Sequence, residues 1–234
     1  MNSSIELAIK PVFEKPSGAK FAFGGIIADR AEANLKNWLL SAPIANPAIL
    51  QMFRDQERQP HRDLLPWSGE FVGKYLISAV QAWRISKDED LKKLIDDVIK
   101  ELIDSQLPDG YLGPFTHDLR LTSDKWDTWG HYHWMLAFLM YYDDTKFQPA
   151  LDACCKACDL IHKTFVGTEN RMKSPELNLA ILHGACLLYE KTGKPQYLEL
   201  AEWVIEELDK PGSCGYIEDA LAGKEIQEFR ARRW

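Results

Sequence analysis

The sequence lacks the features that mark several large classes of protein. Its 28 lysines and arginines against 35 aspartates and glutamates give a formal net charge of −7, which repels nucleic acid and anionic membranes. No window approaches the roughly 20 apolar residues that a transmembrane helix needs, and no signal peptide is visible at the start. We therefore expect no nucleic-acid partner, no membrane partner and a cytoplasmic location.

Several catalytic motifs are missing as well. There is no glycine-rich phosphate loop, no G-x-S-x-G elbow and no H-E-x-x-H helix. The five cysteines are an odd number in a chain too long to depend on disulfides, which favours a reducing compartment. Three of them form the run CCKAC at Cys154, Cys155 and Cys158, where helical spacing favours core packing over metal ligation. We assign no metal site and no cofactor to this chain, and its catalytic residues stay unknown.

What the sequence does contain is helical periodicity, in a chain of 234 residues that is 46% hydrophobic. Strand signals are few, so we expect a mainly α protein with about seven helices. Residues 1–24 read as an extended arm, with a short strand at 5–12, ahead of a single domain at 25–234. Ser68 is the expected N-cap of its helix. The expected helices run from about Ile27 to before Pro43, then over 48–53, 69–85, 88–106, 134–142, 147–166, 175–191 and 196–208.

One pattern recurs three times: the apolar end of a helix, a polar turn, and a second amphipathic helix. The copies are AWRISKDEDLKKLIDDVIKEL, MYYDDTKFQPALDACCKACDLI and LLYEKTGKPQYLELAEWVIEEL. Helix hairpins repeated at unequal intervals are typical of an α-solenoid or an α/α toroid. The long loops at 107–125 and 164–175 follow the second helix of a pair, which favours a toroid with a site on its loop rim.

The most aromatic run, WDTWGHYHWMLAFLMYY at 126–142, supplies four candidates for that site: Trp126, Asp127, His131 and His133. On a helix, Asp127 and His131 share a face, whereas His131 and His133 point apart and cannot converge on a metal. Carboxylate, imidazole and flat aromatic faces suit a sugar or another polyol. His183, on an apolar helix, reads as a core histidine.

Two shorter motifs add candidates, each with two open interpretations. In DGYLG, Asp109 and Tyr111 either grip a ligand or form a tight turn that packs on the next helix. In PWSGE, Trp67 and Glu70 either face the site or begin a helix, with Glu70 capping it together with Ser68. A glycoside hydrolase needs two carboxyl groups facing each other, and the sequence does not show which acids do so.

With these segments in view, the chain resembles the β-L-arabinofuranosidase-like proteins of glycoside hydrolase family 127. The stretches that carry the resemblance are ADRAEANLKNWLLSAPIANPAILQMFRD, PWSGEFVGKYLISAVQAW, SQLPDGYLGPF, WDTWGHYHWMLAFLMYYDDT, LLYEKTGKPQYLELAEWVIEE and EFRARRW. The resemblance implies an (α/α)6 barrel of six helix hairpins and hydrolysis of arabinofuranosides or related glycosides. Six hairpins require twelve helices, so it also implies that this chain corresponds to the amino-terminal part of the barrel.

The resemblance also implies roles for individual residues. Characterised members are longer and carry their cysteine nucleophile, zinc-binding cysteines and acid/base glutamate in the second half of the barrel. His133, Asp127, Asp109 and Tyr111 match first-half positions, which implies substrate binding and not the chemical step. Because half a toroid leaves apolar flanks open, we expect self-association or pairing with a missing second half. The alternatives are a non-catalytic helical repeat that binds sugar or protein, and an inverting hydrolase using Asp127 with Glu70 or Asp109.

Overall fold

The computed structural model describes residues 22–210 and 215–225, and all of its regular secondary structure is helical. Most of the predicted arm at 1–24, including the strand expected at 5–12, lies outside these residues. The sequence predicted about seven helices; the described residues form eleven α-helices and one π-helix, of which seven have ten residues or more. The elements are α1 (Gly25–Asn34), the π-helix η1 (Leu35–Leu39), α2 (Ala42–Ala45), α3 (Ala48–Arg54), α4 (Glu70–Ser86), α5 (Glu89–Asp104), α6 (Asp127–Thr145), α7 (Gln148–Phe165), α8 (Pro175–Asn178), α9 (Ile181–Thr192), α10 (Pro195–Asp209) and α11 (Tyr216–Leu221).

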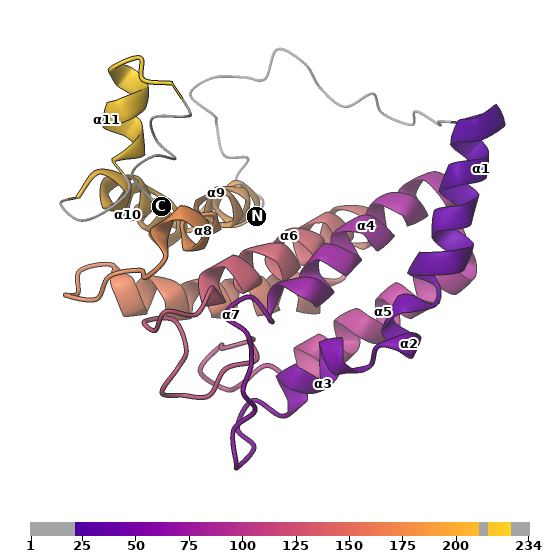
Figure 1. Ribbon diagram of the computed structural model, residues 1–234, viewed down its shortest axis with the longest axis horizontal. Coiled ribbons are helices and arrows are strands. Elements are labelled where there is room, and N and C mark those ends of the chain that lie inside the picture. The colour runs from indigo at the N-terminus through magenta and orange to yellow at the C-terminus, as the bar shows by residue number, and fades with distance from the viewer. Residues whose placement is uncertain (1–21, 211–214, 226–234) are drawn as a thin grey trace.

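The long helices pair into three hairpins: α4 with α5, α6 with α7, and α9 with α10. The first helices of neighbouring hairpins pack side by side, and α4 and α6 run together through the middle of the molecule (Figure 1). They are parallel, because Gly69 approaches Gly130 at one end and Arg84 Nε lies 2.6 Å from the Asp144 carboxylate at the other.

The third hairpin continues the same arrangement. Helix α9 is parallel to α6, since Thr128 Oγ1 bonds to the Asn178 carbonyl just before α9 and Lys191 Nζ lies 2.5 Å from Asp143 near the other end. Of the second helices, α7 contacts both α5 and α10, and the three form a second layer. Three parallel inner helices backed by an outer layer are the hairpins of an α/α toroid, which confirms the predicted fold.

Sequence patterning explains which helix lies where. In α5, Leu91, Ile95 and Leu102 are completely buried on one face while its acids and lysines stay outward, as expected of an outer helix. The Asp88 carboxylate caps α5 by accepting the Leu91 N–H at 2.8 Å. Helix α6 has buried residues on all sides, because it lies between α4, α7 and α9.

Several predicted helix boundaries are wrong. Pro43 does not stop the first helix, which changes to a π-helix after Asn34; the proline lies in the first turn of α2, where its missing N–H costs nothing. The expected helix at 175–191 is two helices, α8 and α9. Gly69, not Ser68, is the N-cap of α4, and no side chain caps it.

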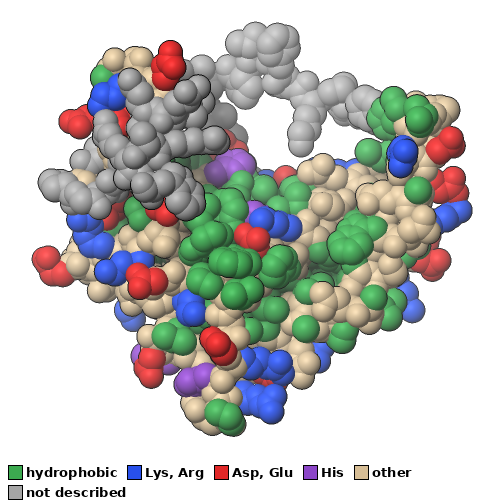
Figure 2. All heavy atoms as spheres, viewed as in Figure 1, with side chains coloured by type: hydrophobic (Ala, Val, Ile, Leu, Met, Phe, Trp, Pro, Cys, Tyr) green, Lys and Arg blue, Asp and Glu red, His purple; other side chains and the backbone are tan. Residues whose placement is uncertain are grey.

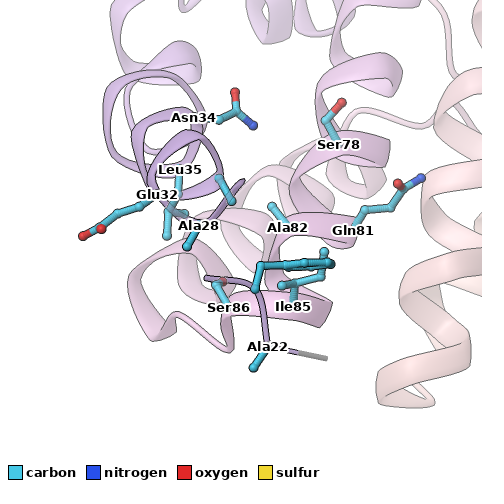
Figure 3. A pocket seen from close by; sticks show the side chains of 12 residues that line it. Ala22, Ala28, Glu32, Asn34, Leu35, Ser78, Gln81, Ala82, Ile85 and Ser86 are labelled. Carbon is cyan, nitrogen blue, oxygen red and sulfur yellow. The ribbon is translucent and has the colours of Figure 1, made fainter. Parts of the chain in front are cut away.

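The flank of α4 away from α6 is open. A groove of about 680 Å³ separates α1 from the second half of α4, with Ala28 and Leu35 on one side and Ala82 and Ile85 on the other (Figure 3). A second hollow of about 510 Å³, lined partly by Trp38, continues toward the start of α4. Hydrophobic side chains are plainly visible on this face of the molecule (Figure 2).

Within the described ranges, no helix is both long and apolar enough to span a membrane.

Candidate functional site

The candidate residues gather where α4, α6 and α9 begin, at one end of the inner layer. The loops that enter α4 and α6 are joined there by a hydrogen bond from the Trp126 N–H to the Pro66 carbonyl, at 2.9 Å. Glycine on both helices allows the backbones to touch: a Cβ on Gly130 would lie 3.2 Å from the carbonyl carbon of Gly69. The side chains of the first turns of α4 and α6 are therefore brought against one another.

Glu70 is the buried carboxylate of this end, with 8% of its surface exposed. One oxygen lies 2.9 Å from Lys74 Nζ, and the other accepts the indole N–H of Trp129 on α6. Such partners offset the cost of burying a charge. The predicted capping of α4 by Glu70 and Ser68 is therefore wrong. Sequence reasoning missed Lys74 and Trp129, although Lys74 follows Glu70 at the i,i+4 spacing of a helical ion pair.

His133 lies beside this pair. Its Nδ1 is 2.8 Å from the Trp129 carbonyl, which can only accept, so Nδ1 carries the hydrogen and Nε2 of the neutral ring is an acceptor. The ring meets Trp129 edge-on, with 4.4 Å between centroids. Burial lowers the pKa of His133, and the positive charge of Lys74 also lowers it, so the imidazole is neutral at pH 7.

A wall of packed rings runs from α6 to α9, formed by Trp129, His133 and Tyr132 of α6 and His183 of α9. Tyr132 packs against His133 at 5.1 Å between ring centroids and against His183 at 5.8 Å. The Tyr132 hydroxyl is also 3.1 Å from Nδ1 of His183. His183 is exposed, so its interpretation as a core histidine is wrong.

A second aromatic group lies in the loops that lead into these helices. Trp67 and Trp126 pack together, with ring centroids 5.1 Å apart and planes inclined at 44°. Both side chains are half-buried, so each combines a supported ring with some open surface. The two residues come from positions far apart in the chain, and the structure brings them together; their contact with a ligand stays a prediction.

Asp127, Tyr111 and His131 lie in the interior, with 2% or less of each exposed. Asp127 accepts the Tyr111 hydroxyl at 3.0 Å and the Leu121 N–H at 2.8 Å, and His131 Nδ1 lies 2.9 Å from the Asp127 carbonyl. The predicted shared face of Asp127 and His131 is confirmed, as is the divergence of His131 from His133. These contacts fasten the loop at 107–125 to α6. Direct ligand contact by the three stays a prediction, and their burial argues against it.

Asp109 belongs to the same loop. Its carboxylate accepts the Tyr111 N–H at 3.1 Å and lies 3.2 Å from Arg120, whose guanidinium stacks over the Tyr111 ring at 4.8 Å. Gly110 has a φ of +99°, a conformation that favours glycine. Of the two interpretations left open for DGYLG, these contacts favour the turn.

Asn178 is a residue that sequence reasoning missed. It is 1% exposed, and its side-chain oxygen accepts the Trp129 N–H at 3.1 Å. Its amide nitrogen donates to the carbonyls of Lys125 and Lys173, at 3.1 and 2.6 Å. Asn178 thus holds the first turn of α6 to the segment before α9. No local pattern in the sequence marks such a residue, because all of its partners are distant in the chain or belong to the backbone.

The described cysteines do not form a reactive centre. Cys154 and Cys158 are buried and unpaired, and burial raises the pKa of both thiols. Burial likewise raises the pKa of Cys155 and Cys186. In the part of the chain that the structure describes, no group of three or more histidines, cysteines and acids could hold a metal ion. These residues therefore do not fit the zinc site of the resemblance.

Parallel inner helices, an outer layer and a polar–aromatic wall at one end define a protein of the α/α-hairpin toroid class. A family model for the GH127 catalytic domain of β-L-arabinofuranosidases matches residues 29–232. The chain belongs to this family.

Individual relatives agree with the family and are longer than this chain. A non-reducing end β-L-arabinofuranosidase from Bifidobacterium longum is 28% identical over 151 residues, which cover 58% of this chain and 22% of that protein. The crystal structure of a GH127 β-L-arabinofuranosidase from Geobacillus stearothermophilus T6 superposes with a TM-score of 0.66 at 22% identity, covering 85% of this chain and 34% of that one. A GH127 β-arabinofuranosidase structure matches at the same TM-score with 17% identity, over 86% and 34%. The chain thus spans about a third or less of these relatives.

Proposed function

We propose that this chain is a carbohydrate-active protein that supplies the sugar-binding wall of a glycoside hydrolase site for arabinofuranoside-like glycosides. The observation that carries the proposal is that Glu70 of α4 and His133 of α6 both bond to Trp129. A buried carboxylate and a neutral imidazole with a free acceptor nitrogen lie among the rings of Trp129 and Tyr132. A few placed polar groups among aromatic faces are the usual composition of a small-molecule site.

In this proposal the described residues bind and orient the sugar. A hydroxyl of the sugar donates to Nε2 of His133. The apolar face of the sugar ring packs on the indoles. Glu70 already has a partner on each oxygen, Lys74 and Trp129, which suits a group that holds the wall in shape better than one that exchanges protons. The retaining and inverting mechanisms each need a second carboxyl group at a defined separation, and we assign no catalytic pair.

Calorimetric titration of the whole chain with methyl β-L-arabinofuranoside tests this proposal. We expect saturable binding that Glu70→Gln weakens by about tenfold, since the change leaves Lys74 without its buried anion, a loss of roughly 1.4 kcal/mol. Glu101→Gln is the matched control, because Glu101 also pairs with a cation, Arg54, but on outer helix α5. Absence of binding, or equal effects of the two variants, would contradict the proposal.

A non-catalytic sugar-binding module is the second candidate. It is favoured by the raised pKa of every described thiol, because a cysteine nucleophile needs a lowered one. A glycoside-release assay on the same samples separates the two functions. Release of arabinose supports the hydrolase, whereas binding without release supports the module.

The apolar groove on the open flank of α4 favours a protein partner, in addition to the sugar. We propose that this groove is covered by further α/α hairpins, either those of a second copy or those that complete the toroid. Sedimentation of the chain as a stable, well-folded monomer would argue against a second copy.

A cytoplasmic location also stays a prediction, to be tested by fractionating the source cells.

A further inference from the structure

We infer that Tyr132 and His183 form a second subsite, which binds the sugar unit or aglycone that follows the arabinofuranosyl group. The inference rests on the proposed function, because it extends the wall that contains Glu70 and His133. A glycoside cleaved or held at one unit still has a second unit to accommodate. The wall must therefore continue in some direction beyond the first ring.

The rings of the inner wall show that direction. From His133 the contacts pass to Tyr132 at 5.1 Å and on to His183 at 5.8 Å. Trp129 flanks the same path, 6.2 Å from Tyr132. The path leaves α6 and ends on α9, so the next inner helix contributes to the binding surface. Exposure rises along it, from the buried His133 through the half-buried Tyr132 to the exposed His183.

The chemistry of the pair suits a second polar ligand group. The Tyr132 hydroxyl lies 3.1 Å from Nδ1 of His183. When this hydroxyl donates to Nδ1, the neutral imidazole carries its hydrogen on Nε2 and is a donor there. His133 offers an acceptor at the corresponding atom. With that tautomer the wall presents an acceptor and then a donor, separated by the Tyr132 ring, and successive sugar units would differ in the hydrogen bond they make as well as in position.

Histidine at position 183 also needs a reason other than packing. Its neighbours on α9, Gly184 and Ala185, are buried, whereas His183 is exposed and its Nδ1 contacts the Tyr132 hydroxyl. A tyrosine that bonds to the histidine holds the imidazole in one orientation. An oriented, accessible donor loses less side-chain entropy on binding than a free one does.

Two glycosides and three variants test the subsite. Affinities of the whole chain are measured for methyl β-L-arabinofuranoside and for a disaccharide with an L-arabinofuranosyl group at its non-reducing end. We expect the wild type to bind the disaccharide more tightly. His183→Ala should weaken disaccharide binding by about tenfold and Tyr132→Phe by about threefold, each corresponding to loss of one hydrogen bond or less. Binding of the methyl glycoside should change by less than about twofold in His183→Ala.

His162→Ala is the matched control, because His162 also bonds to a side chain, Glu199, but in the outer layer between α7 and α10. If His183→Ala weakens both glycosides alike, or neither, the subsite is wrong while the proposed function stands. If the wild type binds neither glycoside, the proposed function fails and the subsite fails with it. Circular dichroism of each variant shows that the helices are intact.

Discussion

Gly73 of α4 lies directly against the backbone of His133 in α6. A Cβ atom built on Gly73 would be 2.6 Å from the carbonyl carbon of His133 and 2.5 Å from the Trp134 nitrogen. Because no side chain separates the helices, the Glu70–Lys74 edge of α4 reaches the Trp129–His133 edge of α6. The contact between two backbones is therefore what assembles the proposed sugar wall.

The first prediction concerns this contact. Gly73→Ala should destabilise the protein by about 1–3 kcal/mol, because the new methyl group overlaps rigid backbone and forces the helices apart. Urea unfolding followed by circular dichroism measures the change. The same shift should weaken sugar binding, since it separates Glu70 from Trp129.

Gly184→Ala is the control for that prediction. Gly184 is also a helical glycine on an inner helix, but its Cβ would meet only the ends of side chains, the nearest being Tyr132 at 3.7 Å. That is ordinary contact, and replacing glycine by alanine in a helix stabilises it by up to about 1 kcal/mol. Similar losses in the two variants would show that close helix approach is not the cause.

The sequence was sufficient to predict the fold because the hairpins repeat. Apolar spacing in α5 and α7, a polar turn before each second helix and the order of the motifs identify antiparallel pairs without knowledge of tertiary contacts. The split between α8 and α9 was not predictable in this way. Asn178 ends α8, and its side chain bonds to backbone groups of Trp129, Lys125 and Lys173; the first two partners are distant in the chain and are not visible in a local pattern.

The site was predictable only in outline. The helical spacing of Asp127, His131 and His133 correctly separated two faces of α6, but it could not say which face was interior. The structure places Asp127 and His131 against Tyr111, and it places His133, which is also buried, against Trp129 where α6 meets α4. His183 was misjudged because an apolar helix suggests burial. Its contact with Tyr132, which lies in a distant segment of the chain, is not visible in the sequence around it.

The second prediction concerns the interior cluster. Tyr111→Phe removes a hydroxyl that donates to Asp127 and accepts the Phe115 N–H, so both partners become less satisfied in a dry environment. We expect a loss of about 2–3 kcal/mol in the free energy of unfolding, since one partner is a carboxylate. Tyr75→Phe is the comparison: its buried hydroxyl bonds to one backbone carbonyl, that of Leu39, and its loss should cost about 1 kcal/mol. Equal losses in the two variants would contradict the role of Asp127 in fastening the loop at 107–125 to α6.

The third prediction concerns the thiols. Burial raises the pKa of Cys154 and Cys158, which lowers the thiolate fraction on which alkylation depends. At pH 8 the native protein should therefore leave both unlabelled by a maleimide over a time in which urea-unfolded protein is fully modified. Peptide mapping by mass spectrometry gives the result for each cysteine. Cys186, which is half-buried, serves as the internal comparison and should react sooner. Rapid native labelling of Cys154 would contradict its packing role.

The fourth prediction concerns pH and His133. Burial lowers its pKa in the folded state, whereas the unfolded chain should titrate near the ordinary value of about 6.5. The unfolded state thus takes up a proton first as pH falls, so stability is retained above about 6.5 and is lost as pH falls from there through the lower folded pKa. The difference between wild type and His133→Asn in urea unfolding at pH 7, 6 and 5 isolates this contribution.

Sugar binding should depend on the protonation state of the same imidazole, that of His133. Protonation converts Nε2 of His133 from an acceptor into a donor, so affinity for methyl β-L-arabinofuranoside should fall over the pH range in which the folded imidazole titrates. His117→Asn is the control, because the side chain of His117 is 78% exposed and lies outside the wall. If wild type and His117→Asn lose affinity as pH falls while His133→Asn binds weakly at every pH, His133 supplies the acceptor. If His133→Asn keeps the wild-type affinity and pH profile, the acceptor is another group, and the orientation of the sugar on α6 must be revised.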